Sequence, residues 1–297
     1  MTRSDELATA FLAARPRLVG VAYAVLGSYA EAEDVVSDTW LRLVAADDVD
    51  RIRDVDAWAT VAVARAALDA YRSARVRRER YVGPWLPEPL VGTNPDADPA
   101  DRVTLDDRVS FAMLVVLESL TPAERTAWVL HDLFGMPFDE VAEVVGRRPE
   151  AVRKLATRAR AHLREHAPRI EVDTDAHCRA VTRFLAAAAG GDLAALLAVL
   201  DPAVTLTSDG GGEVSAALRP VHGADRVARF VLGITARATD EQARVVTVNG
   251  ATGIGLFRGD TLSGVVSLSI HAGRINRVDI VRAPGKLNGV HPTGEAS

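Results

Sequence analysis

The chain has 297 residues, of which 48% are hydrophobic and 25% are charged, so it can build two or three packed domains. The formal net charge of -5 excludes a general polyanion binder, and any nucleic-acid contact must come from local basic faces. The single Cys178 excludes a disulfide framework, and the seven scattered histidines give no metal-ligand spacing, so we expect no metal and no cofactor. The sequence has no long apolar run either, so we expect no signal peptide, no membrane span and a soluble cytoplasmic protein.

Residues 4–82 have the pattern of a helical domain. Apolar residues recur at helical spacing from Leu7 to Val25, with a break expected near Pro16. Two more helices are expected over 30–46 and 57–81. The last of them ends in five arginines, namely Arg72, Arg75, Arg77, Arg78 and Arg80. A basic helix end alone is more often a solvated face than a nucleic-acid site, so this segment does not fix the function.

Residues 83–104 are rich in Pro, Gly and Asp, and this composition predicts an extended linker. The linker contains one apolar stretch, Trp85-Leu86-Pro87-Glu88-Pro89-Leu90. Prolines keep such a stretch stiff, which suits docking into a groove. The alternative is local packing of Trp85 on the neighbouring helix.

Residues 105–167 predict a second helical domain with a helix-turn-helix. Apolar residues from Phe138 to Val145 form one helical face, Gly146 can end that helix, and Pro149 suits the first turn of the next. The second helix has an apolar inner face and a basic outer face, which is typical of a DNA-recognition helix. An ordinary helical hairpin with a solvated basic face remains the alternative.

Residues 172–290 change pattern: two helices come first, and alternating strands follow. This order predicts an α+β cone around an apolar pocket that could take a small-molecule ligand, with a flexible tail over 288–297. Asp201, Asp209 and His222 are the candidate catalytic residues. Asp201 precedes a proline, Asp209 precedes three glycines and His222 precedes Gly223, so turn, loop or cap roles are favoured over catalysis.

Residues 15–43 and 56–81 resemble region 2 of the extracytoplasmic-function (group IV) RNA polymerase sigma factors, and residues 117–164 resemble their region 4. The resemblance implies that region 2 docks on core polymerase and opens the -10 promoter element, while region 4 reads the -35 element. The implied core-polymerase contacts are Asp34, Asp38, Trp40 and Arg42. The implied -10 contacts are Trp58, Arg65, Asp69, Arg72 and Arg75, although many family members have Asn where Arg65 stands. The implied -35 contacts are Arg147, Arg148, Glu150, Arg153, Lys154, Thr157 and Arg158, and Arg160 is a further candidate for a phosphate contact.

The stretch from Trp85 to Leu90 also resembles a signature of the sigma factors that carry a C-terminal SnoaL-like (nuclear transport factor two-like) extension, the SigJ-like group. Asp209-Gly210-Gly211-Gly212 resembles the DGGG motif of that group, although Glu213 stands where a basic residue commonly follows. Pro284, Lys286 and Leu287 match its NPDKL-type motif, but the Asn and the Asp do not. The resemblance implies a regulatory contact made by Trp85, Leu86, Pro87, Glu88, Pro89, Asp209, Gly210, Gly211, Gly212, Lys286 and Leu287.

The sequence therefore predicts a multidomain fold: two all-α domains followed by a SnoaL-like cone. The predicted function is that of an alternative sigma factor, not an enzyme, whose third domain modulates activity through the linker. The expected partners are core RNA polymerase (the β′ clamp and the β flap) and promoter DNA, with the chain acting as a monomer. Two alternatives stay open: a one-component regulator with a ligand domain, and a cone-domain enzyme fused to a DNA-binding unit.

Overall fold

The computed structural model describes residues 2–78, 81, 83–92, 109–166 and 174–287. These residues form two compact units, one made of 2–78, 109 and 113–166, the other of 81, 83–92, 110–112 and 174–287. The predicted segments 4–82 and 105–167 thus share one unit, while the predicted linker joins the predicted domain 172–290. Residues 79–80, 82, 93–108, 167–173 and 288–297, including part of the linker and the expected tail, lie outside the described residues.

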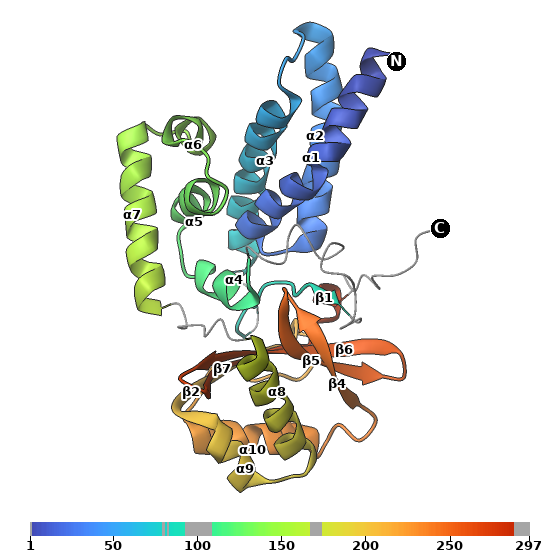
Figure 1. The fold of residues 1–297 in the computed structure, drawn as a ribbon, viewed down its shortest axis with the longest axis vertical. Helices are drawn as coiled ribbons and strands as arrows, with labels where there is room; N and C mark the ends of the chain where they lie inside the picture. The colour runs from blue at the N-terminus through green and yellow to red at the C-terminus, as the bar shows by residue number, and fades with distance from the viewer. Residues whose placement is uncertain (1, 79–80, 82, 93–108, 167–173, 288–297) are drawn as a thin grey trace. The chain divides into compact units, whose positions relative to one another are not determined.

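Three long helices open the first unit: α1 (Arg3–Leu26), α2 (Tyr29–Val49) and α3 (Val55–Arg78) (Figure 1). The hydroxyl of Thr2 caps α1, and Gly27 ends it in the left-handed conformation at φ 72°. The expected break near Pro16 is wrong, because α1 runs through this proline. Residues 18–26 of α1 are all buried, and this packing offsets the hydrogen bond that the proline removes.

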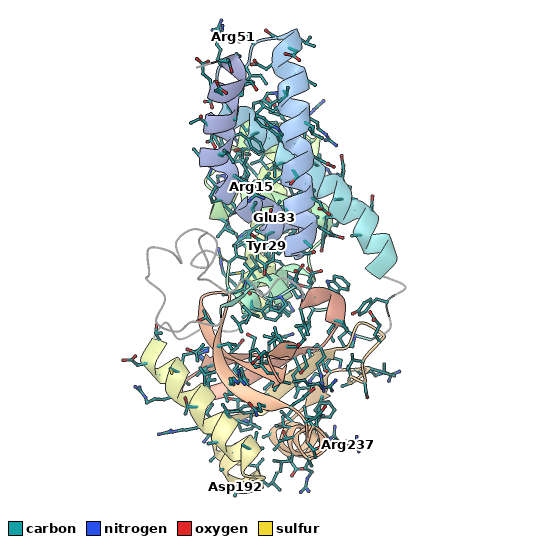
Figure 2. The ribbon with its side chains drawn as sticks, turned by 90° about the vertical axis from the view of Figure 1, so that its right-hand side faces the viewer. Arg15, Tyr29, Glu33, Arg51, Asp192 and Arg237 are labelled. Atoms are coloured by element: carbon teal, nitrogen blue, oxygen red, sulfur yellow. The ribbon has the colours of Figure 1, made fainter. Side chains whose placement is uncertain are left out.

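The helix α1 is long and apolar enough to meet the length and composition test for a membrane span, contrary to expectation. In this structure 61% of its most apolar window is buried inside the protein. An ion pair between Arg15 of α1 and Glu33 of α2 lies outside that packed face (Figure 2). These features are typical of the central helix of a helical domain.

The rest of the first unit is the predicted helix-turn-helix with the helices that support it. The elements are α4 (Phe111–Leu117), of which residues 113–117 belong to this unit, α5 (Pro122–Trp128), a π-helical turn (Val129–Leu133), α6 (Phe138–Val145) and α7 (Pro149–His166). Thr121 and Glu124 form a capping box at the start of α5, with Pro122 in its first turn. The bounds of α6 and α7 confirm the predicted pair of helices.

One apolar core joins the two helical segments of this unit. Val21 of α1 and Ala64 of α3 are buried in the same cluster as residues of α5, α6 and α7. From the helix-turn-helix side, this cluster contains Ala127, Leu130, Met136, Val141, Ala142, Val144, Val145, Val152 and Leu155. The two segments therefore pack on each other, whereas the sequence presents them as separate modules.

The second unit is built on a seven-stranded sheet in the order β1-β4-β5-β6-β7-β2-β3. The strands are β1 (Val91–Gly92), β2 (Leu200–Asp209), β3 (Val221–His222), β4 (Gln242–Val248), β5 (Ala251–Arg258), β6 (Thr261–His271) and β7 (Arg274–Val281). All pairs are antiparallel as expected, except that β2 and β7 run parallel. The edge strand β1 comes from the linker and was not expected.

Three helices, α8 (Thr174–Ala189), α9 (Leu193–Val199) and α10 (Ala224–Thr235), pack on this sheet. Asp192 caps α9 by accepting a hydrogen bond from the amide of Ala195 at 2.9 Å (Figure 2). Register shifts between β5 and β6 and between β6 and β7 bend the sheet around the helices. The helices and the curved sheet confirm the predicted cone.

Candidate nucleic-acid interface and linker clasp

The basic face of α7 lies open to solvent. Val152, Leu155 and Ala159 are buried, and the residues between them point away from the core. All seven residues predicted to contact a -35 element are exposed: Arg147, Arg148, Glu150, Arg153, Lys154, Thr157 and Arg158. This geometry brings the predicted -35 residues together on and before one helix, as entry into a major groove requires.

Two contacts order this basic face. The guanidinium of Arg153 lies 5.4 Å from the centre of the Phe138 ring, and the hydroxyl of Thr157 donates to the carbonyl of Arg153 at 2.8 Å. By contrast, Arg160 forms an ion pair with Asp132. Since its charge already has a partner, Arg160 is a weaker candidate for a phosphate contact than its sequence position indicates.

The residues predicted to bind the -10 element line one stripe of α3. Arg65, Asp69 and Arg72 are exposed and Trp58 is half-buried, at helical spacings that share a face. Asp69 and Arg72 form an ion pair at 3.2 Å. Arg75 lies on the same helix, but its side chain is outside the described part of the structure.

Arg65 contacts the helix-turn-helix in this structure. Its guanidinium lies 3.7 Å from the carboxylate of Glu143 in α6 and donates to the Glu143 carbonyl at 3.3 Å. The stripe on α3 is thus in contact with the module that carries the other predicted DNA site. In this packing, one predicted -10 residue is engaged by protein.

The predicted polymerase-binding residues of α2 do not form one cluster. Asp34, Asp38 and Arg42 are exposed, but Trp40 is half-buried and packs on Phe11 with ring centres 5.3 Å apart. The exposed apolar residue beside the acidic ones is Leu41, which is 67% exposed and which the sequence reasoning missed.

A buried arginine that the sequence reasoning also missed connects three helices. Arg125 of α5 is fully buried, and it donates to the Ala24 carbonyl at 3.0 Å and to the Tyr71 hydroxyl at 3.2 Å. It also forms an ion pair with Glu118. Burial lowers the pKa of Arg125, but the charge of Glu118 and the hydrogen bonds outweigh burial, so the pKa lies above its ordinary value.

In the second unit, the carboxylate of Asp209 holds the linker. One oxygen accepts from the Leu86 amide at 2.8 Å and from the Lys286 ammonium at 2.6 Å. The other oxygen accepts from the Tyr81 hydroxyl and from the Gly211 amide at 3.0 Å. We call these five residues the linker clasp, and the structure thus joins the three motifs that the sequence singled out.

Lys286 completes the clasp through aromatic contacts. Its ammonium lies 3.0 Å from the centre of the Trp85 ring and donates to the Leu86 carbonyl. The Tyr81 ring packs edge-on against Trp85 with centres 5.0 Å apart. Burial, followed by the bond to the Asp209 carboxylate, raises the pKa of the Tyr81 hydroxyl. Tyr81 was not among the predicted residues.

The glycines after Asp209 are required by space and backbone conformation. A Cβ on Gly210 would lie 2.0 Å from the Val214 carbonyl oxygen. Gly211 has φ +73°, and a Cβ there would lie 3.0 Å from that of Ala283. The other predicted contact residues, Pro87, Glu88, Pro89 and Leu287, are buried, whereas Gly212 is exposed.

The linker is also paired with the edge of the sheet. Val91 and Gly92 form β1 against Val248 and Thr247 of β4. Just before β1, Leu90 donates to the Asn249 side chain at 3.0 Å, and its carbonyl accepts from the Asn249 amide at 2.9 Å. The linker residues Leu90, Val91 and Gly92 therefore pair with the edge of the C-terminal sheet, the last two as an added strand.

The candidate catalytic residues lie outside the pocket of the cone. Asp201 accepts from the Ala203 amide at 2.8 Å, and His222 bonds the Thr205 hydroxyl at 3.1 Å. Asp209 belongs to the clasp. Within the described residues, no three His, Cys, Asp or Glu side chains could hold a metal ion together. Asp201 and Asp209 each accept from the amide two residues later, as a turn residue does, although both lie in β2, and His222 lies in β3 rather than in the expected loop.

Comparison with known proteins gives the class of this chain. A Sigma-70 region 2 model matches residues 10–77, and a Sigma-70 region 4 model matches residues 110–163. The ECF RNA polymerase sigma factor SigJ of Mycobacterium tuberculosis is 46% identical over 228 residues, which cover 76% of this chain and 72% of that protein. The probable ECF RNA polymerase sigma factor SigI of the same organism is 38% identical over 295 residues, covering 97% of each chain.

The crystal structure of M. tuberculosis SigJ has a TM-score of 0.76 with this chain at 36% identity, and covers 95% of this chain and 99% of that one. Two sigma-70 regions in this order define a sigma factor, a promoter-specificity subunit that works with core RNA polymerase on promoter DNA. More narrowly, the chain belongs to the extracytoplasmic-function RNA polymerase sigma factors. The predictions of fold class, of an alternative sigma factor and of a non-enzyme are confirmed.

Proposed function

We propose that this sigma factor is regulated by its own C-terminal domain, which holds the linker between regions 2 and 4. The observation that carries the proposal is the Asp209 carboxylate, because it accepts hydrogen bonds from the Tyr81 hydroxyl, just before the linker, and from the Leu86 amide within it. A sigma factor must place its two DNA-binding regions on two promoter elements at once. Fixing or releasing the linker changes the effective concentration of one region near the other element.

Regions 2 and 4 must separate before both can bind a promoter. The -35 and -10 elements are roughly 80 Å apart along B-DNA, at about 3.4 Å per base pair. A unit in which α5 and α6 share a core with α1 and α3 cannot span that distance. We therefore infer that this unit is a closed form, and that linker release adds freedom to the segment that must extend.

The DNA contacts follow from the exposed faces. We assign Arg148, Glu150, Arg153 and Lys154, near the start of α7, to the bases of the -35 element, and Arg147 and Arg158 to phosphates. Trp58, Arg65, Asp69, Arg72 and Arg75 of α3 are assigned to the -10 element. Unstacked bases need aromatic and apolar surface, and the freed backbone needs cations.

The polymerase contacts use α2 and region 4. Asp34, Asp38 and Arg42, with Leu41 as the apolar centre, form a surface suited to the β′ clamp, and Trp40 supports this surface from inside through Phe11. Region 4 binds the β flap. The chain acts as a monomer in the cytoplasm.

Arg153→Ala tests base reading by α7. A bidentate arginine–guanine contact contributes about 1–3 kcal/mol of discrimination between bases. We expect this variant to change which promoters are used, while Arg158→Ala weakens binding on all templates alike. Transcription from a panel of -35 sequences measures the difference. An equal loss on every template in the Arg153 variant would contradict base reading.

Run-off transcription with purified core polymerase tests the regulation. Full-length protein is compared with a version that ends after Glu171 and with Asp209→Asn in the full chain. The distance between regions 2 and 4 is measured in parallel by fluorescence transfer. We expect activity and the distance distribution to change in both variants. If neither changes, the C-terminal domain does not regulate through the linker.

A further inference from the structure

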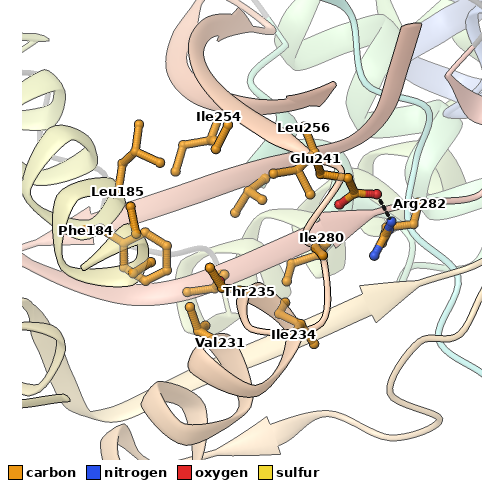
Figure 3. Close-up of a pocket in the computed structure, with 16 residues that line it drawn as sticks. Phe184, Leu185, Val231, Ile234, Thr235, Glu241, Ile254, Leu256, Ile280 and Arg282 are labelled. Carbon is orange, nitrogen blue, oxygen red and sulfur yellow. Dashed lines mark hydrogen bonds and ion pairs between the residues drawn. The ribbon is translucent and has the colours of Figure 1, made fainter. Parts of the chain in front are cut away.

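The cone contains a cavity of about 110 Å³ that the sigma-factor function does not use (Figure 3). Its walls come from α8, α10 and strands β4 to β7, and most of its lining side chains are aliphatic or aromatic. Examples are Phe184, Leu185, Val231, Ile254 and Ile280. An apolar cavity of about 150 Å³ can hold a benzene ring, so this one suits a body of at most that size.

One end of the cavity is charged. Glu241 and Arg282 line it and form an ion pair, and the Glu241 side chain is only 3% exposed. The same Glu241 oxygen accepts from the Ser263 hydroxyl at 3.1 Å and lies 3.0 Å from the Arg258 guanidinium. On the solvent side, Arg258 also pairs with Asp240 at 3.2 Å. The Glu241 oxygen that faces these donors is therefore already used.

One hydrogen-bond donor of Arg282 is not used by the contacts above. Its Nε is buried and has no hydrogen-bond partner among the described residues. Buried donors without an acceptor are rare in proteins, because the lost hydration is not replaced. The donor belongs to a guanidinium, so the acceptor that best completes it is an anion, and a carboxylate matches its geometry.

We propose that this cavity binds a small carboxylic acid with an apolar body about the size of a six-membered ring. The carboxylate accepts from Arg282, and the body lies between Phe184, Val231 and Ile254. A basic ligand is disfavoured, since Arg258 and Arg282 both lie at this end and one Glu241 oxygen, Oε1, already accepts from both of them and from Ser263. The charged end lies beside Arg258, which is 56% exposed, so the acid enters with its carboxylate toward solvent.

The same segment that lines the cavity also carries the linker clasp. The backbone amide of Arg282 donates to the Asp209 carbonyl at 2.7 Å, and that of Ala283 donates to the same oxygen at 3.2 Å. Lys286 of the clasp follows four residues after Arg282. A ligand that fixes Arg282 therefore stabilises the clasped state of the linker. This coupling rests on the proposed regulation through the linker, whereas binding itself does not.

Benzoate is the probe, titrated into the full chain by calorimetry. We expect saturable binding that weakens about tenfold or more in Arg282→Met, because the charged hydrogen bond is lost. Benzyl alcohol, a neutral molecule of the same size, should bind at least about tenfold more weakly than benzoate. The matched control is Arg183→Met, an exposed arginine of α8 next to Phe184, with affinity unchanged. No saturable binding, or equal affinity in Arg282→Met, overturns the site.

A second variant tests the cavity itself. Val231→Ile combined with Val266→Ile adds one methyl group to each of two walls. We expect a higher melting temperature, because a void is filled, together with several-fold weaker benzoate binding. Unchanged binding in this variant would place benzoate elsewhere.

Hydrogen exchange at the Leu86 and Leu90 amides tests the coupling. Benzoate should slow exchange at both amides several-fold in the natural chain and leave it unchanged in Arg282→Met. Binding without slower exchange would overturn the coupling and leave the acid site standing. Because none of these measurements uses transcription, failure here is distinct from failure of the proposed regulation.

Discussion

Two joints in this molecule connect segments far apart in sequence, and each is built around a buried cation. Arg125 joins region 4 to region 2, and Lys286 joins the C-terminal domain to the linker. At both joints the ion pair lies within one partner: Glu118 accompanies Arg125 in region 4, and Asp209 accompanies Lys286 in the C-terminal domain. The groups that the opposite partner offers to each cation are neutral. Each cation therefore keeps its carboxylate when its joint opens.

The joints differ in what else they bury. The joint between regions 2 and 4 shares an apolar core that includes Val21 and Ala64. The linker joint buries one continuous strip of the linker, Leu86, Pro87, Glu88, Pro89 and Val91. Opening the first joint exposes apolar surface from several helices, whereas opening the second exposes one strip of the linker and the surface that it covers. The linker clasp is thus the better place for a reversible signal.

Breaking the first joint at its cation should have the largest effect. Arg125→Met removes the charge that pairs with Glu118 and the donors to Ala24 and Tyr71. We expect the free energy of unfolding to fall by about 3 kcal/mol, as when one partner of a buried ion pair is removed. Denaturant unfolding measures it, with exposed Arg164→Met as the control. A loss as small as that of the control would mean that the apolar core alone holds regions 2 and 4 together.

Breaking the second joint should release the linker without unfolding the cone. Asp209→Asn keeps the shape but removes the charge that pairs with Lys286, so we expect a loss of about 2 kcal/mol and faster exchange at the Leu86 amide. Hydrogen exchange measures both the loss of global stability and the local release of the Leu86 amide. Adding Lys286→Met to Asp209→Asn should recover part of the stability, because no unpaired charge remains. A double variant no more stable than the single one would contradict this account.

The glycine turn allows a finer comparison within the clasp. A Cβ at Gly210 would lie 2.0 Å from a backbone oxygen, whereas a Cβ at Gly212 meets nothing within 4 Å. Gly212 has φ +77°, so Gly212→Ala should cost only about 1 kcal/mol of strain. We expect Gly210→Ala to displace the turn and release Leu86, measured by its exchange rate. Equal effects of the two variants would show that turn conformation, not space, determines the clasp.

Much of this architecture can be predicted from sequence, because it rests on local signals. Gly146 and Pro149 mark the turn between α6 and α7, and the alternation of residues predicts the strands of the cone. The meeting of the Trp85 stretch, the glycine turn and Lys286 follows from motifs that identify a group of proteins. The hydrogen bonds of this contact cannot be predicted in the same way, because no local pattern shows that the Asp209 carboxylate accepts from Tyr81 and Leu86.

The residues that sequence reasoning missed act through long-range contacts. Arg125 resembles any charged residue of a short amphipathic helix, and only packing shows that it is fully buried between three helices. The strand β1 is two residues long, so it has no periodicity to detect. Pro16 predicted a helix break that does not occur, because buried neighbours keep α1 continuous through it.

The smallest effect is expected at the exposed edge of the first joint, where Arg65 meets Glu143. Their side chains are 51% and 67% exposed, so the pair should contribute about 0–1 kcal/mol to the closed form. Glu143→Ala should therefore leave stability nearly unchanged, and Arg65 should keep its hydrogen bond to the carbonyl of residue 143. Fluorescence transfer between regions 2 and 4 distinguishes the closed form from the open form. We expect the transfer efficiency to change little in this variant. A large shift toward the open form would show that this surface pair, rather than Arg125 and the shared apolar core, holds regions 2 and 4 closed.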